Sequence, residues 1–266
     1  MTPVEIVRGN SPIVLGLPHT GTWLPEDIYA QLNARGRQLS DTDWHIHQLY
    51  HGLLPQVTTV RAGFHRYVVD ANRDPSGASL YPGQNTTGLV PLTDFDGAPI
   101  WANPPHEADI ADRREAFHAA YHAALKAEME RVRALHGVAI LYDCHSIRSV
   151  IPHLFDGLLP DFNIGTNGGT TCAPEIEIAV KGICEGADGF TSVLNGRFTG
   201  GWTTRHYGRP EEGFHAIQME LAQSTHLSDE TAGWAYAPEK ANRLRPVLQS
   251  ILTALADLAP KLRCDQ

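Results

Sequence analysis

Residues 141–148 read Leu-Tyr-Asp-Cys-His-Ser-Ile-Arg and directly follow the apolar residues 138–140, Val-Ala-Ile. This pattern predicts a short, fully buried strand that ends on side chains able to do chemistry. In open α/β sheets, ligands bind in the crevice outside the carboxyl ends of the strands. We therefore expect the end of this strand to form part of a functional site.

Two other apolar runs lead to polar side chains in the same way. Residues 13–17 lead to His19, and residues 65–70 lead to Asn72 and Arg73. Parallel strands place their carboxyl ends at the same edge of a sheet. We expect the three ends to meet there.

Predicted helices alternate with predicted strands along the chain. Besides the strands already described, the apolar periodicity predicts helices at about 25–35, 44–53, 105–135, 174–185 and 238–257 and strands at 57–61, 190–194 and 215–221. This order is typical of an α/β fold, and we expect a three-layer α/β/α sandwich around a mixed, mostly parallel sheet. No linker divides the chain, so residues 1–266 are expected to form a single catalytic domain. Long active-site loops are predicted at about 74–105, 160–173 and 196–212, because long loops in compact domains are usually functional.

The composition is that of an ordinary globular chain, with 42% hydrophobic and 19% charged residues. Its formal charge of −9 predicts no basic surface for nucleic acid or an anionic membrane. No apolar run approaches the roughly 20 residues that span a bilayer, and the N-terminus lacks the pattern of a secretory signal. We therefore expect a cytoplasmic protein with a small-molecule substrate, and the oligomeric state is left open.

His19 and His145 each stand at the end of a predicted apolar strand. A single histidine of this kind is best interpreted as an ordinary hydrogen-bonded residue, but two imidazoles and a carboxylate are a common ligand set for catalytic zinc. Asp43 is the preferred carboxylate because it opens a predicted helix close to His19 in the sequence. Asp143 is the alternative, either as a ligand or as a group that orients one. We predict one divalent metal ion, zinc first, with cobalt, manganese and iron as alternatives.

Glu220 lies within an apolar run, residues 215–221. Acidic side chains are almost never buried without a partner, so this position needs an explanation. A structural ion pair is one explanation. A general base that takes a proton from water explains the position at least as well.

Three arginines are candidates for binding an anionic substrate. Arg73 has the chemistry to clamp a carboxylate with two parallel hydrogen bonds, and its alternative is an ion pair with Asp70 or Asp74. Arg148 and Arg205 are the further candidates.

Five short segments follow one another in an order that is more specific than any one of them. They are residues 18–21 (PHTG), 41–44 (DTDW), 70–73 (DANR), 143–146 (DCHS) and 200–208 (GGWTTRHYG). Over about residues 11–230 this set resembles the N-formylglutamate deformylase (N-formylglutamate amidohydrolase) family, which more distantly resembles the zinc carboxypeptidases. The resemblance implies a carboxypeptidase-like fold and the cleavage of N-formyl-L-glutamate to formate and L-glutamate, the last step of one route of histidine degradation.

The resemblance also implies roles for individual residues. The implied roles are zinc ligation by His19 and His145, general base catalysis by Glu220, and a carboxylate clamp formed by Arg73 with Asn72. A substrate with two carboxylates needs a second cation, and Arg148 or Arg205 is expected to supply it.

One position departs from the carboxypeptidase pattern. The carboxylate ligand of carboxypeptidases follows the first histidine by three residues, and this chain has Thr22 there, a poor zinc ligand. Asp43 is inferred to take its place. The oxyanion formed in the reaction is expected to be held by the metal and by one of Arg205, His206 and Tyr207.

Three other functions are compatible with these residues. The same site could remove the acyl group of another N-acyl amino acid or of a small peptide. Two histidines and a carboxylate also form the metal-binding triad of non-haem iron oxygenases. A binding protein for acidic amino acids is the third alternative, and it gives Glu220 no role.

Overall fold

A computed structural model of the chain describes residues 2–79 and 83–263. Its centre is a seven-stranded sheet in the order β1-β3-β2-β4-β7-β5-β6. The strands are β1 Val4–Val7, β2 Ile13–Leu17, β3 Thr58–Ala62, β4 Ala139–Ile147, β5 Phe162–Gly165, β6 Ser192–Leu194 and β7 Phe214–Ala222. The pairs β1/β3 and β5/β7 are antiparallel and the other neighbouring pairs are parallel, so the sheet is mixed and mostly parallel, as predicted.

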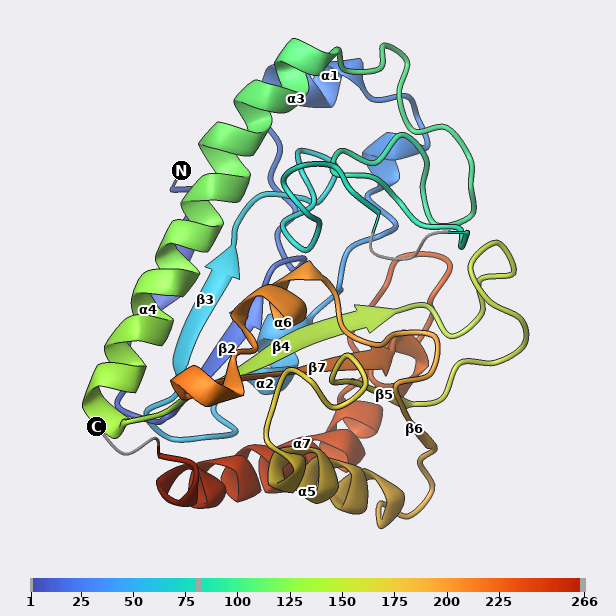
Figure 1. The fold of residues 1–266 in the computed structure, drawn as a ribbon. Coiled ribbons are helices and arrows are strands. Elements are labelled where there is room, and N and C mark those ends of the chain that lie inside the picture. The colour runs from blue at the N-terminus through green and yellow to red at the C-terminus, as the bar shows by residue number, and fades with distance from the viewer. Residues whose placement is uncertain (1, 80–82, 264–266) are drawn as a thin grey trace.

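Helices cover both faces of this sheet (Figure 1). They are α1 Glu26–Gln31, α2 Ile46–Tyr50, α3 Glu107–Arg113, α4 Ala120–His136, α5 Pro174–Glu185, α6 Trp202–Tyr207 and α7 Pro238–Leu258. α4 packs on one face, against β2, β3 and β4, and α2, α5 and α7 pack on the other. The result is a three-layer α/β/α arrangement. Among the described residues, no helix combines the length and the apolar character needed to cross a membrane.

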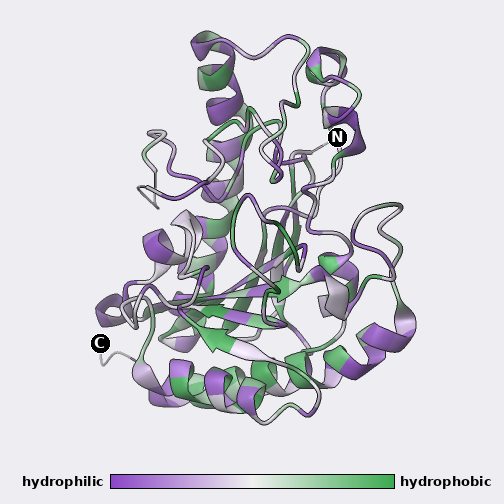
Figure 2. Ribbon diagram, turned by 90° about the vertical axis from the view of Figure 1, so that its right-hand side faces the viewer, coloured by the Kyte–Doolittle hydropathy of each residue, from purple (hydrophilic) through white to green (hydrophobic). Residues whose placement is uncertain are grey.

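The side chains of the central strands alternate between the two outer layers. In β2, Ile13 and Leu15 belong to the core shared with α2, α5 and α7, whereas Val14 belongs to the core shared with α4. Figure 2 shows hydrophobic residues concentrated in the strands and on parts of the surrounding helices. A strand that is buried on both faces has a nearly continuous apolar sequence. That is why β2, β4 and β7 were predictable.

The strand predicted at residues 65–70 is wrong. This segment is a turn in which the Val68 backbone N–H donates to His65 O. The sheet order places β3 between β1 and β2, and β2 between β3 and β4, so neither strand has a free edge for another partner. The apolar residues of the segment are buried without joining the sheet.

Other differences concern short elements. β1 was not predicted, β5 lies inside the loop expected at 160–173, and α6 lies inside the loop expected at 196–212. The predicted helix at 105–135 is α3 and α4 joined by a π-helical turn, Arg114–Ala119. α2 begins at Ile46 after His45, whose φ of 60° is left-handed, so Asp43 precedes the helix and does not open it as predicted.

Candidate metal centre and substrate pocket

His19 and His145 lie side by side at the carboxyl edge of the sheet. β2 and β4 are parallel with Gly16 opposite Asp143, so both bring the residues that follow to the same edge. The ring centroids of the two histidines are 5.0 Å apart. Both side chains are buried.

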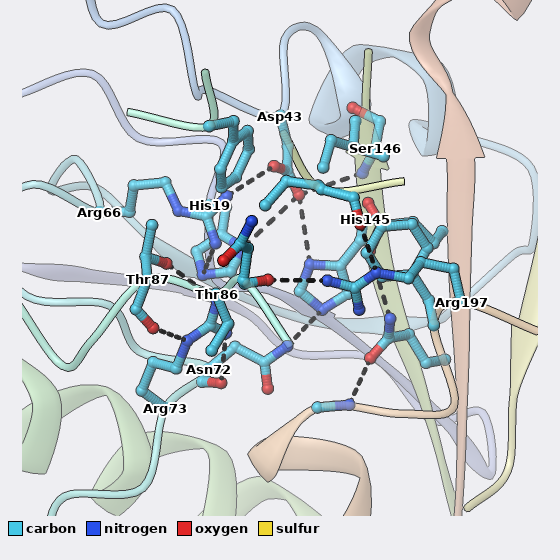
Figure 3. Close-up of a pocket in the computed structure, with 18 residues that line it drawn as sticks. His19, Asp43, Arg66, Asn72, Arg73, Thr86, Thr87, His145, Ser146 and Arg197 are labelled. Carbon is cyan, nitrogen blue, oxygen red and sulfur yellow. Dashed lines mark hydrogen bonds and ion pairs between the residues drawn. The ribbon is translucent and has the colours of Figure 1, made fainter. Parts of the chain in front are cut away.

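Asp43 faces both imidazoles (Figure 3). Its backbone N–H donates to His19 O at 3.1 Å, which ties the turn before α2 to the end of β2. Its Oδ2 lies 3.7 Å from His19 Nδ1 and 3.3 Å from His145 Nδ1. One ligand atom from each residue lies within 4.8 Å of the others, and all three residues are buried. This group could hold a metal ion.

The other nitrogen of each imidazole faces a second carboxylate. His19 Nε2 lies 2.7 Å from Asp70 Oδ1, and His145 Nε2 lies 3.1 Å from Asp143 Oδ2. Histidines that bind metals are commonly held by a carboxylate in this way, which leaves the lone pair of the inner nitrogen for the metal. His19 Nδ1 is buried and has no hydrogen-bond partner among the described residues. The two imidazoles and the Asp43 carboxylate therefore form a set of ligand atoms that fits a cation.

The carboxylates around the cluster favour positive charge at this point. Burial opposes a charge on His145, but Asp143 and Asp43 outweigh burial and raise the pKa of this imidazole. Burial also opposes a charge on Asp43, yet His145 and His19 hold the pKa of this carboxyl below its usual range. A bound cation would be stabilised by the same negative field.

β7 places Glu220 beside this cluster. β7 is parallel to β4, and their register sets Glu220 opposite His145. Burial raises the pKa of the Glu220 carboxyl to about 8, and Gln218 Nε2 donates to its Oε2 at 3.3 Å. None of the ion pairs found among residues 2–79 and 83–263 involves Glu220. Within that part of the chain, a structural ion pair does not account for the buried carboxylate.

Arg66 lines the same pocket, although its sequence position did not single it out. Its guanidinium donates to Asp70 Oδ2 at 2.8 Å and lies 3.7 Å from Asp43 Oδ1. Residues four apart pair readily on a helical turn but lie too far apart in a strand. Because a strand was predicted for this segment, the four-residue spacing between Arg66 and Asp70 did not predict an ion pair.

Asn72 and Arg73, the predicted carboxylate clamp, also line the pocket. Arg73 donates from Nε to Thr87 O at 2.9 Å and from Nη2 to Thr87 Oγ1 at 3.0 Å. Its Nη1 lies 3.8 Å from Asp70 Oδ2. Asn72 Nδ2 lies 3.2 Å from His145 Nε2. Both clamp residues are therefore connected to the histidine cluster.

Three residues predicted to reach the substrate lie outside the pocket lining, because the segment that carries them is the helix α6. Arg205 donates to the backbone of the preceding loop. The His206 ring stacks on Trp202 with centroids 4.3 Å apart, and Tyr207 Oη donates to His122 O at 3.1 Å. The sequence predicted an open loop at residues 196–212, and the side chains of a helical turn point in other directions than those of such a loop.

Arg148 also lies outside the pocket lining, and its Nη2 is paired with Asp96 Oδ1 at 2.8 Å. The pocket wall instead contains Arg197 and Gln218, which were not predicted. Gln218 precedes Glu220 by two residues on β7, so the two-residue period of a strand would have identified it. No comparable pattern marks Arg197, which lies in a loop.

Comparison with known proteins connects this site to a family. Residues 11–227 match the sequence profile of the N-formylglutamate amidohydrolase family. The chain belongs to this family. Two relatives, both named N-formylglutamate deformylase, come from Pseudomonas aeruginosa (44% identity over 253 residues) and Pseudomonas putida (43% over 251). These alignments cover 93% of this chain and 94% and 93% of the relatives.

Solved structures agree with the family assignment. The N-formylglutamate amidohydrolase of Ralstonia eutropha is 25% identical, with a TM-score of 0.81 over 98% of this chain and 99% of that one. A protein of Agrobacterium tumefaciens, 18% identical, shares the fold with a TM-score of 0.74 over 97% and 96% of the two chains. The resemblance to the N-formylglutamate deformylase family found in the sequence is therefore confirmed. As an N-formylglutamate amidohydrolase family member, the chain is an enzyme that hydrolyses an amide bond.

Replacing Asp143 with asparagine is expected to weaken metal binding by about 10- to 100-fold, because the carboxylate that orients His145 is lost. Competition with a chelator of known affinity measures the change. Asp188→Asn, which alters an exposed carboxylate, serves as the control. Unchanged metal affinity in Asp143→Asn would contradict the orienting role, and complete loss of the metal would make Asp143 a direct ligand.

Proposed function

We propose that the protein hydrolyses N-formyl-L-glutamate to formate and L-glutamate. The observation that carries this proposal is the buried cluster of His19, Asp43 and His145 beside Glu220, in a pocket that also contains Arg73. The family assignment and the names of the relatives point to the same substrate. By the resemblance noted in the sequence, the reaction would be the last step of one route of histidine degradation, and a carboxypeptidase-like fold remains part of the proposal.

We propose that one divalent metal ion is held by His19 Nδ1, His145 Nδ1 and the Asp43 carboxylate, with Asp143 and Asp70 orienting the histidines. Zinc is the first choice because this donor set is common in catalytic zinc sites. Cobalt, manganese and iron accept the same ligands. When bound, such an ion would polarise the formyl carbonyl and make water more acidic.

Glu220 acts as the general base in this proposal. It takes a proton from the water whose oxygen bonds to the formyl carbon, and then gives that proton to the amide nitrogen as the C–N bond breaks. The products are formate and the free amine of glutamate. Gln218 holds one Glu220 oxygen during these transfers. Arg66 supplies positive charge beside the ligand cluster, since it lies 3.7 Å from Asp43.

Arg73 and Asn72 bind the α-carboxylate of the substrate in this proposal. Arg73 is anchored by Thr87, and the Asn72 carboxamide is fixed because the Thr203 N–H donates to its oxygen at 2.9 Å. Gly201 lies against this carboxamide so closely that an added Cβ would come within 2.3 Å of Asn72 Nδ2. A glycine is therefore needed to keep the clamp in place.

The proposal is tested by measuring formate release from N-formyl-L-glutamate and acetate release from N-acetyl-L-glutamate, together with elemental analysis of the purified protein. We expect one divalent metal ion per chain and a clear preference for the formyl substrate. Preference for the acetyl compound would favour a different deacylase. Oxygen consumption by an iron-containing protein would favour an oxygenase, and saturable binding without formate release would favour a binding protein.

A further inference from the structure

The pocket wall contains three arginines, Arg66, Arg73 and Arg197 (Figure 3). Arg66 contacts two acidic residues, since it donates to Asp70, which holds His19, at 2.8 Å and lies 3.7 Å from Asp43 of the ligand cluster. Arg73 lies 3.8 Å from Asp70 and donates to the oxygens of Thr87, and Arg197 donates to backbone oxygens of neighbouring loops. Because Arg66 is held against the proposed metal ligand Asp43, Arg73 and Arg197 are the arginines of the pocket lining suited to meet the two carboxylates of a dicarboxylate substrate.

Arg73 is tied closely to the histidines. Its Nη1 donates to Asn72 O at 3.1 Å, and the Asn72 carboxamide lies 3.2 Å from His145 Nε2. The same Nη1 lies 3.8 Å from Asp70, which holds His19. A carboxylate bound by Arg73 would therefore lie near the reacting amide. In N-formylglutamate the α-carboxylate is separated from the formyl group by the amide nitrogen and Cα alone, so it fits this position.

Arg197 is fixed by different partners. It lies in the loop between β6 and α6, and it donates from Nε to Leu154 O at 3.0 Å and from Nη2 to Asn85 O at 2.9 Å. These carbonyls belong to two other loops, so the guanidinium joins three loops at the pocket wall. A guanidinium has five N–H donors, so it can bind a carboxylate without giving up these two bonds.

An apolar surface accompanies Arg197. The Arg197 Cζ lies 5.3 Å from the centroid of the Phe198 ring. Phe198, Leu154, Ile147 and Phe95 all line the pocket and belong to one small apolar cluster. This surface fits the two methylene groups that separate Cα of glutamate from its side-chain carboxylate. Apolar surroundings also strengthen a hydrogen bond between an arginine and a carboxylate.

We propose that Arg197 binds the side-chain carboxylate of the substrate and thereby selects N-formyl derivatives of acidic amino acids. The inference rests on the proposed function and replaces Arg148 and Arg205, which lie outside the pocket lining, as the second carboxylate partner. Arg73 binds the α-carboxylate, which every N-formyl amino acid carries. Arg197 binds a group that only the acidic ones have.

The test compares N-formyl-L-glutamate with N-formyl-L-glutamine, which has nearly the same shape and no side-chain charge. In Arg197→Met, kcat/KM for the glutamate substrate is expected to fall by at least about 30-fold, the effect of removing one partner of a buried charge pair. For the glutamine substrate the expected fall is less than about 3-fold, because no ion pair is lost there. Arg197→Lys should recover part of the lost selectivity, since it restores the charge without the planar fork.

The glutamine substrate also reports any disturbance of the three loops, because such a disturbance would lower the activity on both substrates. Arg209→Met, which removes an exposed arginine bonded to Glu212, is the matched control and should change neither substrate. Equal losses on both substrates in Arg197→Met would overturn the inference, as would a selective loss in Arg148→Met. If the unaltered protein releases formate from neither substrate, the proposed function itself fails, and this inference fails with it.

Discussion

Replacing Glu220 with glutamine is expected to lower kcat for formate release by about 10²- to 10⁴-fold, the usual contribution of a general base. The metal content should stay the same, because Glu220 is not part of the three-residue cluster. Glutamine keeps the size of the side chain and its hydrogen-bonding capacity but cannot accept a proton from water. Steady-state kinetics with elemental analysis of the same preparation measures both quantities.

Glu239→Gln, which alters an exposed glutamate on α7, is the matched control and should leave turnover unchanged. Near-normal turnover in Glu220→Gln would show that another group takes the proton. Loss of the metal in the same variant would instead place Glu220 among the ligands. Either result would require a different mechanism for the site.

Replacing His19 with alanine is expected to abolish stoichiometric metal binding and to lower kcat/KM by at least about 10³-fold, since a catalytic metal contributes several kcal/mol of transition-state stabilisation. His19 belongs to the ligand cluster, and its Nδ1 has no hydrogen-bond partner among the described residues. This nitrogen is therefore the atom that the metal would lose. Elemental analysis and formate release check the two effects.

The variant also leaves the buried Asp70 without its histidine partner, so the fold must be checked by circular dichroism and thermal unfolding. His19→Gln retains a polar side chain there and separates loss of the ligand from loss of the fold. His51→Ala, at an exposed histidine, is the control. A folded His19→Ala protein that keeps one tightly bound metal ion would contradict the proposed ligand set.

The layers of the fold were largely predictable because their signals are local. β2, β4 and β7 are buried on both faces and appear in the sequence as apolar runs. α5 and α7 begin and end within a residue or so of the predicted limits, since each starts at a proline and keeps a helical apolar period. The segment at 65–70 has an equally apolar sequence but forms a turn, because the sheet has no free edge beside β2 and β3.

The sequence by itself determined which residues could do chemistry at the edge of the sheet. His19 and His145 each come at the end of an apolar run, and Glu220 is an acidic residue within another. These runs form the parallel strands β2, β4 and β7, which bring the three residues together. Only the tertiary structure decided what surrounds them. Arg66 lies beside Asp43, the α6 residues Arg205, His206 and Tyr207 lie outside the pocket lining, and Arg197 lies within it. These positions depend on how segments distant in the chain pack, and the sequence pattern around each residue carries no information about that packing.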